Sequence, residues 1–157
     1  MFATMLGATV LFSLSWSDAP AAWSSDYSKA VADACLADKP LFIVICPGSS
    51  EYARFAALGT FVSDDVERSL KNDYTRVMID TDTPEGKEMA QKFGVEEGPH
   101  FVIIDRSGKW QIFYQSGYLS ESKIGIALGK FRRIKLTAAG RPVQEVVRRQ
   151  VVQLCST

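Results

Sequence analysis

The sequence predicts an α/β domain in which helices flank both faces of a central mixed β-sheet. Segments with helical spacing alternate with short apolar runs, which is typical of parallel strands joined by helices. Two later runs flank a tight turn, which indicates an antiparallel hairpin. The chain has 157 residues, 46% of them hydrophobic, which is enough for one core of ordinary size.

The first predicted helix begins after capping residues at 24–26 and ends near Asp38, where a Lys-Pro pair breaks the pattern. Residues 41–46 are a continuous apolar run rich in β-branched side chains. Such a run is typical of a central strand that is buried on both faces. The next four residues turn the chain, and Ser50 then caps a second helix that runs to about Leu58.

A third helix is predicted to begin at Ser63, and a second strand covers residues 74–79. The fourth helix follows Pro84 and ends at Gly94, because glycine suits the left-handed conformation of a helix C-cap.

Two further strands, 101–104 and 110–114, form the predicted hairpin around a polar turn. The last helix of the domain is capped by Ser120. The predicted order within residues 23–133 is therefore α-β-α-α-β-α-β-β-α.

Residues 1–22 precede these elements and allow two interpretations. The apolar run 5–14 is long enough for a signal-peptide core and too short to span a bilayer, and small residues offer a cleavage point before Trp23. No Lys or Arg precedes the run, so the alternative is an N-terminal strand or helix that packs on the domain. The first interpretation implies export to the bacterial periplasm or medium, and the second implies a cytoplasmic protein.

Residues 134–157 form a C-terminal extension. After the break at 140–142, apolar residues recur at helical spacing and predict an amphipathic helix. These residues are Val143, Val146, Val147, Val151, Val152 and Leu154. The helix either packs on the domain or supplies a docking or dimer surface, and nothing in the sequence specifies an oligomeric state.

The composition excludes several classes of function. Eighteen basic and eighteen acidic residues give a formal net charge of zero, so bulk electrostatics recruits neither nucleic acid nor an anionic membrane. His100 is the single histidine, and Cys35, Cys46 and Cys155 are too scattered for a zinc cage or a disulfide scaffold. No nucleotide or phosphate motif is present, and we expect no metal or cofactor.

The order of elements resembles thioredoxin, and the detail resembles the bacterial thioredoxin-like domains related to the C-terminal domain of transmembrane thiol-disulfide interchange reductases. In that group a Lys-Pro pair opens the central strand, and a Trp-Cys-x-x-Cys-Lys segment follows it. Here Lys39-Pro40 opens the strand, and ungapped counting places residues 49–54 on that segment. Further matches are Thr60-Phe61, Val66, Val77-x-x-Asp80, Gly94-Val95, Gly98-Pro99 and the turn 105–109. The resemblance covers residues 23–133.

The resemblance implies that the redox pair is lost. Ser50 and Ala53 stand where the family has its two cysteines, and Ser49 stands where it has tryptophan. The family's buried acid is replaced by Val44 or an apolar neighbour. An active member needs a thiolate at the helix N-terminus and a second thiol to resolve the mixed disulfide. A hydroxyl and a methyl group supply neither, so we expect no disulfide oxidoreductase activity.

Cys46 supports a rival hypothesis. Together with the next three residues it forms a C-x-x-S pattern, which resembles the monothiol glutaredoxins that use glutathione or an iron–sulfur cluster. That interpretation shortens the turn by four residues and conflicts with the ungapped matches downstream. The alternative is that Cys46 ends the central strand as a small buried hydrophobic residue.

The resemblance also implies a binding groove. Its proline, Pro99 here, is expected to be cis, with Gly98 offering backbone groups to an extended peptide beside Ser49 and Ser50. His100 follows, where the family commonly has threonine. It hydrogen-bonds Ser50 if its side chain faces the turn; the alternative is simple packing, because polar side chains in strands commonly serve local hydrogen bonds.

Three functions therefore remain open. The chain is a non-catalytic module that binds a protein or an extended peptide, an atypical thiol enzyme that uses Cys46 alone, or a structural domain of a larger assembly.

Overall fold

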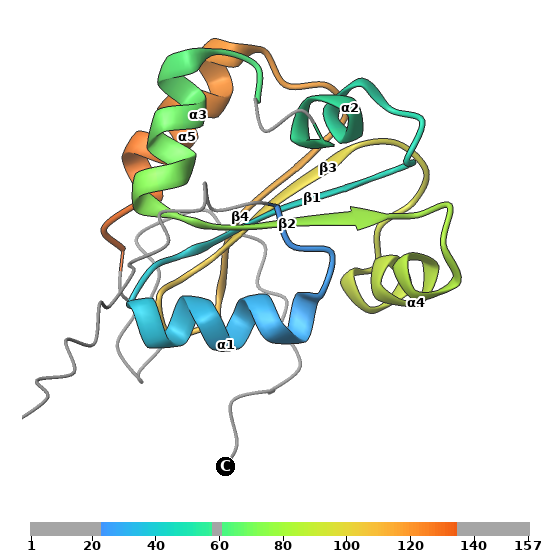
Figure 1. Ribbon diagram of the computed structural model, residues 1–157, viewed down its shortest axis with the longest axis horizontal. Coiled ribbons are helices and arrows are strands. Elements are labelled where there is room, and N and C mark those ends of the chain that lie inside the picture. The colour runs from blue at the N-terminus through green and yellow to red at the C-terminus, as the bar shows by residue number, and fades with distance from the viewer. Residues whose placement is uncertain (1–22, 58–60, 135–157) are drawn as a thin grey trace, which may run out of the picture.

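A four-stranded mixed sheet forms the centre of the computed structural model, which describes residues 23–57 and 61–134 (Figure 1). The strands are β1 (Leu41–Cys46), β2 (Thr75–Asp80), β3 (His100–Ile104) and β4 (Gln111–Ser116), in the spatial order β2-β1-β3-β4. β1 pairs parallel with β2 and antiparallel with β3, and β3 pairs antiparallel with β4. The predicted mixed sheet with its hairpin is confirmed.

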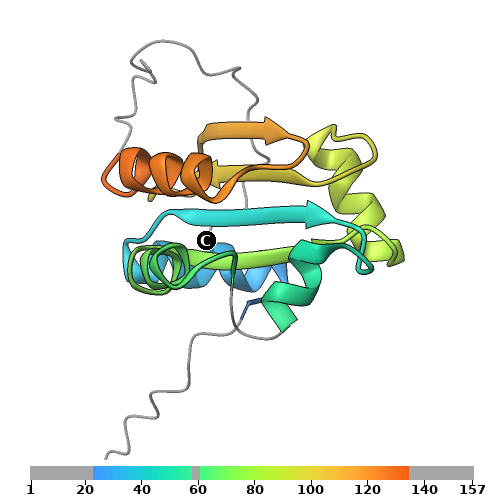
Figure 2. The same cartoon turned by 90° about the horizontal axis from the view of Figure 1, so that it is seen from above.

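Helices cover both faces of the sheet (Figures 1 and 2). The apolar residues of α1 (Tyr27–Ala37) and α4 (Pro84–Phe93) share one core cluster, on what we call the α1–α4 face. Those of α2 (Glu51–Ala57), α3 (Asp64–Asp73) and α5 (Glu121–Phe131) share another, on the α2–α3–α5 face. The predicted order of elements is confirmed. Residues 1–22, residue 58 and the helix expected after residue 142 lie outside the described residues.

Local capping chemistry sets most of the helix ends, as the sequence predicts. The side chains of Asp26, Ser63 and Thr83 each accept a hydrogen bond from a backbone N–H in the first turn of the helix that they precede. Gly94 ends α4 in the left-handed conformation, with φ of 60°. Ser120 precedes α5 but makes no side-chain capping hydrogen bond.

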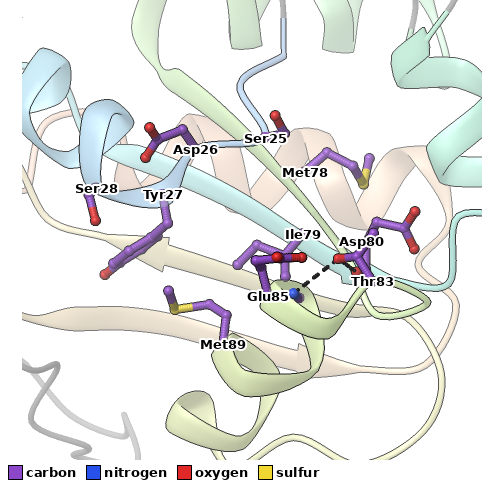
Figure 3. Close-up of a pocket in the computed structure, with 11 residues that line it drawn as sticks. Ser25, Asp26, Tyr27, Ser28, Met78, Ile79, Asp80, Thr83, Glu85 and Met89 are labelled. Atoms are coloured by element: carbon purple, nitrogen blue, oxygen red, sulfur yellow. Dashed lines mark hydrogen bonds between the residues drawn. The ribbon is translucent and has the colours of Figure 1, made fainter.

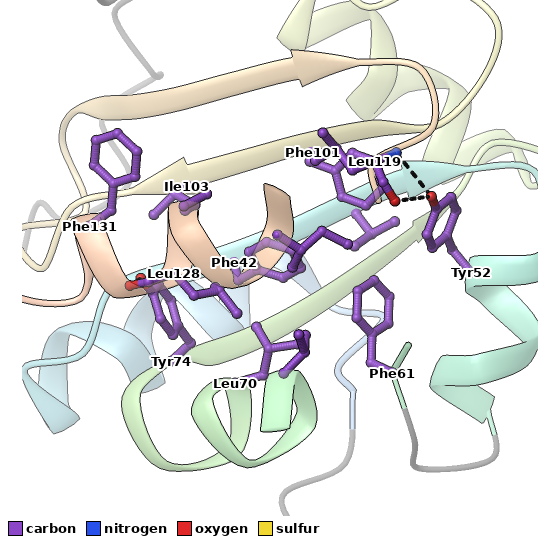
Figure 4. Packing of buried hydrophobic residues seen from close by; sticks show 14 of the residues in the cluster. Phe42, Tyr52, Phe61, Leu70, Tyr74, Phe101, Ile103, Leu119, Leu128 and Phe131 are labelled. Atoms are coloured by element: carbon purple, nitrogen blue, oxygen red, sulfur yellow. Dashed lines mark hydrogen bonds between the residues drawn. The ribbon is translucent and has the colours of Figure 1, made fainter. Parts of the chain in front are cut away.

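The core of the α2–α3–α5 face is centred on Phe42 of β1 (Figure 4). Its ring lies 6.0–6.4 Å, centroid to centroid, from the rings of Trp23, Phe61, Tyr74 and Phe101. All six residues of β1 are apolar and buried, so no acid lies in this strand.

The outer edge of β2 is partly covered by the residues that lead into α1. Ser24 donates its N–H to the Arg76 carbonyl at 3.0 Å and accepts the Met78 N–H at 2.9 Å. The Trp23 ring lies over the Arg76 guanidinium, which also forms a buried ion pair with Glu67. None of the helices in the described part of the chain is long and apolar enough to cross a membrane.

Two helical glycines are expected to respond to alanine with opposite signs. A Cβ on Gly86 in α4 would lie 1.8 Å from the backbone oxygen of Asp80, whereas a Cβ on Gly125 in α5 meets nothing within 4 Å. We expect Gly86→Ala to lower the free energy of unfolding by about 2 kcal/mol through overpacking. Gly125→Ala should raise it by about 0.5–1 kcal/mol, because alanine has the higher helix propensity. Urea unfolding checks both, and equal changes would contradict the close approach at Gly86.

Candidate functional site

The thiol of Cys46 is buried at the end of β1. The residue is 0% exposed, and its Sγ lies 3.0 Å from the hydroxyl of Ser50, which donates to it, and 3.5 Å from Met78 Sδ. Burial raises the pKa of the Cys46 thiol above its ordinary value. The hydrogen bond from Ser50 lowers this pKa in part, and the negative charges of Asp80 and Asp82 raise it. The thiol therefore carries less thiolate at neutral pH than an ordinary cysteine.

Ser50 immediately precedes α2, and its hydroxyl connects the first turn of the helix to Cys46. Its N–H donates to the Pro47 carbonyl at 2.9 Å, which closes the turn after β1. Its hydroxyl oxygen accepts the Ala53 N–H at 3.1 Å while the hydroxyl hydrogen points to the Cys46 sulfur. The structure thus brings Cys46, Ser50 and Ala53 together, and a hydroxyl occupies the start of the helix.

Two acids at the end of β2 and in the loop after it, Asp80 and Asp82, lie against the same turn. The Gly48 N–H donates to the Asp82 carboxylate at 3.0 Å, and a Cβ on Gly48 would lie 2.4 Å from Asp80 Oδ2. A side chain at position 48 would require the Asp80 carboxylate to shift. Neither acid was predicted from the sequence to belong to the site. The available signal was that Cys46 and Asp80 both end parallel strands, whose carboxyl ends meet at one edge of a sheet.

Gly98 and Pro99 lie at the start of β3, beside the end of β1, because His100 pairs with Ile45. The expected cis bond before Pro99 is not found, since no peptide bond among the described residues is cis. Gly98 has φ of +106°, a conformation open to glycine, and this turns the chain into β3 through a trans bond. The Pro99 carbonyl accepts the Gly117 N–H at 2.9 Å.

His100 faces away from Ser50. Side chains alternate across a sheet, so His100, paired with Ile45, lies on the α1–α4 face, whereas Cys46 lies on the opposite face. Its ring nitrogens are occupied: Nδ1 lies 2.9 Å from Tyr114 Oη, and Nε2 lies 2.9 Å from the Glu96 carbonyl oxygen. The hypothesis of a Ser50–His100 hydrogen bond is therefore wrong, and the alternative of local hydrogen bonds holds.

The loop between β4 and α5 is hydrogen-bonded both to Pro99 and to α2. These contacts were not predicted from the sequence. Gly117 bonds the Pro99 carbonyl, while the buried Tyr52 hydroxyl of α2 exchanges hydrogen bonds of 3.1 Å with the Leu119 backbone. Between them Tyr118 is 74% exposed, and its ring lies 5.8 Å from that of Tyr52. A tight glycine turn followed by an aromatic residue was the available signal. We call residues 49–50, 98–99 and 117–119 the three-loop surface.

A separate hollow of about 520 Å³ lies between the start of α1, the outer edge of β2 and the start of α4 (Figure 3). Tyr27, Ile79 and Met89 contribute apolar surface, and Asp26 and Glu85 contribute carboxylates. None of the residues of the three-loop surface lines it.

Comparison with known proteins identifies the fold. No protein-family model and no curated protein matches the chain. Among solved structures it is similar to a thioredoxin from Thermus thermophilus, with 20% identity, 70% of this chain and 86% of that chain covered, and a TM-score of 0.55. It is also similar to the oxidised DsbD C-terminal domain of Neisseria meningitidis, with 15% identity, 70% of this chain and 99% of that chain covered, and a TM-score of 0.51. A DsbH oxidoreductase shares 17% identity, with 78% of this chain and 95% of that chain covered and a TM-score of 0.51. The chain therefore has the thioredoxin-like fold that these thioredoxin and oxidoreductase structures share.

Proposed function

We propose that the chain is a redox-inactive thioredoxin-like domain that binds a protein or an extended peptide. The observation that carries the proposal is the hydroxyl of Ser50 at the start of α2, bonded to a thiol that is wholly buried. Disulfide exchange needs an accessible thiolate, and both the burial and the raised pKa of Cys46 oppose one. If residues 1–22 are a signal peptide, the domain acts outside the cytoplasm.

The three-loop surface supports binding of an extended chain. Gly98 presents its backbone to a partner with no side chain in the way, and such groups bind a peptide by strand addition. The exposed ring of Tyr118 offers a large apolar contact at small cost in side-chain entropy. Because Gly117 and Leu119 are hydrogen-bonded to the neighbouring segments, these contacts are held in place before a partner arrives.

Thiol chemistry on the purified full chain tests the redox half of the proposal. We expect no reduction of insulin disulfides or of glutathione mixed disulfides. Labelling of Cys46 should be at least about tenfold slower in the folded chain than in urea, because the thiol must first become exposed. Labelling should also begin at a higher pH in the folded chain than in urea, since folding raises the pKa of the thiol. Turnover that disappears in Cys46→Ser would instead make the chain a monothiol enzyme.

Binding is tested with reduced, carboxymethylated lactalbumin, an unfolded chain without free thiols. Titration should shift the backbone amide NMR signals of the three-loop surface. Tyr118→Ala should weaken binding about tenfold, as loss of an aromatic anchor does. Ile126→Ala is the matched control, because Ile126 is 68% exposed on α5 and lies outside that surface. Equal effects of the two substitutions, or shifts confined to other parts of the chain, would contradict the proposed surface.

A further inference from the structure

We infer that His100 is a positioning residue that holds segment 96–99 in the shape that the three-loop surface requires. This inference rests on the proposed function, because the shape of the segment matters only if the three-loop surface binds a partner. The imidazole follows Pro99 directly and is 2% exposed, so it lies beneath the segment and away from any partner.

The hydrogen bonds of His100 fix its tautomer. A carbonyl oxygen can only accept, so Nε2, 2.9 Å from the Glu96 carbonyl, carries the hydrogen. In the neutral ring Nδ1 then has a free lone pair, and it accepts the hydroxyl hydrogen of Tyr114 at 2.9 Å. The Tyr114 ring also stacks on the imidazole, with centroids 5.8 Å apart and planes 24° apart. A chain of hydrogen bonds thus runs from the Tyr114 hydroxyl to His100 Nδ1, and from His100 Nε2 to the Glu96 carbonyl.

This chain of hydrogen bonds holds the Glu96 end of segment 96–99, and backbone hydrogen bonds flank the segment on both sides. At one end the Val95 N–H bonds the Ala90 carbonyl of α4, and at the other the Pro99 carbonyl accepts from Gly117. Between them lies Gly98, whose φ of +106° is one of many conformations open to glycine. The bond from His100 to Glu96 restricts this freedom, because it ties the backbone four residues upstream to the rigid start of β3.

A positioning role and a merely structural role of His100 predict different effects on stability and on the order of segment 96–99. The positioning role predicts the following. Glu96 and Tyr114 are exposed residues whose bonds to His100 are part-buried, so we expect water to replace the imidazole as their partner once it is removed. The free energy of unfolding should then change little, while segment 96–99 loses its order. A buried histidine that served only to fill the core would show the reverse.

The experiment measures the ring and the segment separately by NMR of the full chain. At pH ~8 the two ring nitrogen shifts of the wild type should show a protonated Nε2 and a hydrogen-bonded, unprotonated Nδ1. In His100→Leu the backbone order parameters of residues 96–98 should fall from about 0.85 to below about 0.6, while those of α3 stay unchanged. His100→Gln keeps a donor near the position of Nε2 and should restore much of that order. An Nδ1-protonated ring, or an ordered segment in His100→Leu, would overturn the inference.

Carboxymethylated lactalbumin then separates this inference from the proposed function. We expect His100→Leu to weaken binding about tenfold, comparable to the loss of one or two hydrogen bonds. Equal binding by wild type and His100→Leu, despite a disordered segment, would overturn the positioning role and leave the proposed function standing. If the wild type does not bind, the proposed function is contradicted. The order parameters of residues 96–98 would then still test whether His100 orders the segment.

Discussion

Substituting cysteine for Ser50 and Ala53 together is expected to turn this domain into a disulfide reductase. Ser50 Oγ lies 3.1 Å from the Ala53 N–H, so the two side chains occupy one turn at the start of α2. Residues three apart in a helical turn have the Cα separation that a disulfide needs. The helix N-terminus also favours thiolate at the first position. We expect insulin reduction to rise at least about a hundredfold, from background, with a reduction potential between about −270 and −120 mV.

This variant needs a control for Cys46, whose buried thiol lies next to position 50. Cys46 Sγ lies 3.0 Å from Ser50 Oγ, so a thiol introduced at position 50 can pair with Cys46 instead. The double substitution is therefore made in wild-type and Cys46→Ala backgrounds, and peptide mass mapping identifies the disulfide. Ser50→Cys alone should form mixed disulfides without turnover, because it lacks a resolving thiol. Failure of the Cys46→Ala background to form any disulfide would show that positions 50 and 53 do not occupy the places of a redox pair.

Phe42→Ala is expected to lower the free energy of unfolding by about 3–5 kcal/mol. The Phe42 side chain is 1% exposed, and four aromatic rings surround it, so its removal leaves a cavity that these rings can fill only in part. Domains of this size are typically stable by about 5–15 kcal/mol, so the loss is a large share of the total. Urea unfolding monitored by circular dichroism measures it.

Leu36→Ala is the comparison variant, because it removes apolar side chain from the surface instead of from the core. Leu36 lies on α1 and is 87% exposed, so we expect a change within about 0.5 kcal/mol. A comparable loss in both variants would place Phe42 outside the centre of the core.

The sequence was informative for most interactions that are local, the missing capping bond of Ser120 being an exception. Caps such as Asp26, Ser63 and Thr83 act within one helical turn, and the apolar run of β1 shows its burial without reference to any partner. The relation between Cys46 and Ser50 was equally accessible, because four residues and one turn separate them.

What the sequence could not give depends on pairings between distant segments. The face on which His100 lies is set by the register of β3 against β1, and a shift of one residue would move it to the other face. The link from Tyr52 to Leu119 spans 67 positions. The bond before Pro99 is trans, although the family resemblance implied a cis bond.

The backbone pairing of Ser24 has a consequence for shortened forms of the protein. Its two hydrogen bonds occupy the outward-facing groups of Arg76 and Met78, on a strand that lies at the margin of the sheet. A truncation that began at Tyr27 would keep every helix and strand of the described part of the chain, but it would expose those groups together with the aromatic surface beneath Trp23. Unpaired strand margins of this kind recruit other chains and promote aggregation. We therefore expect a shortened form to need Trp23 and Ser24, as well as the first helix, in order to resist aggregation.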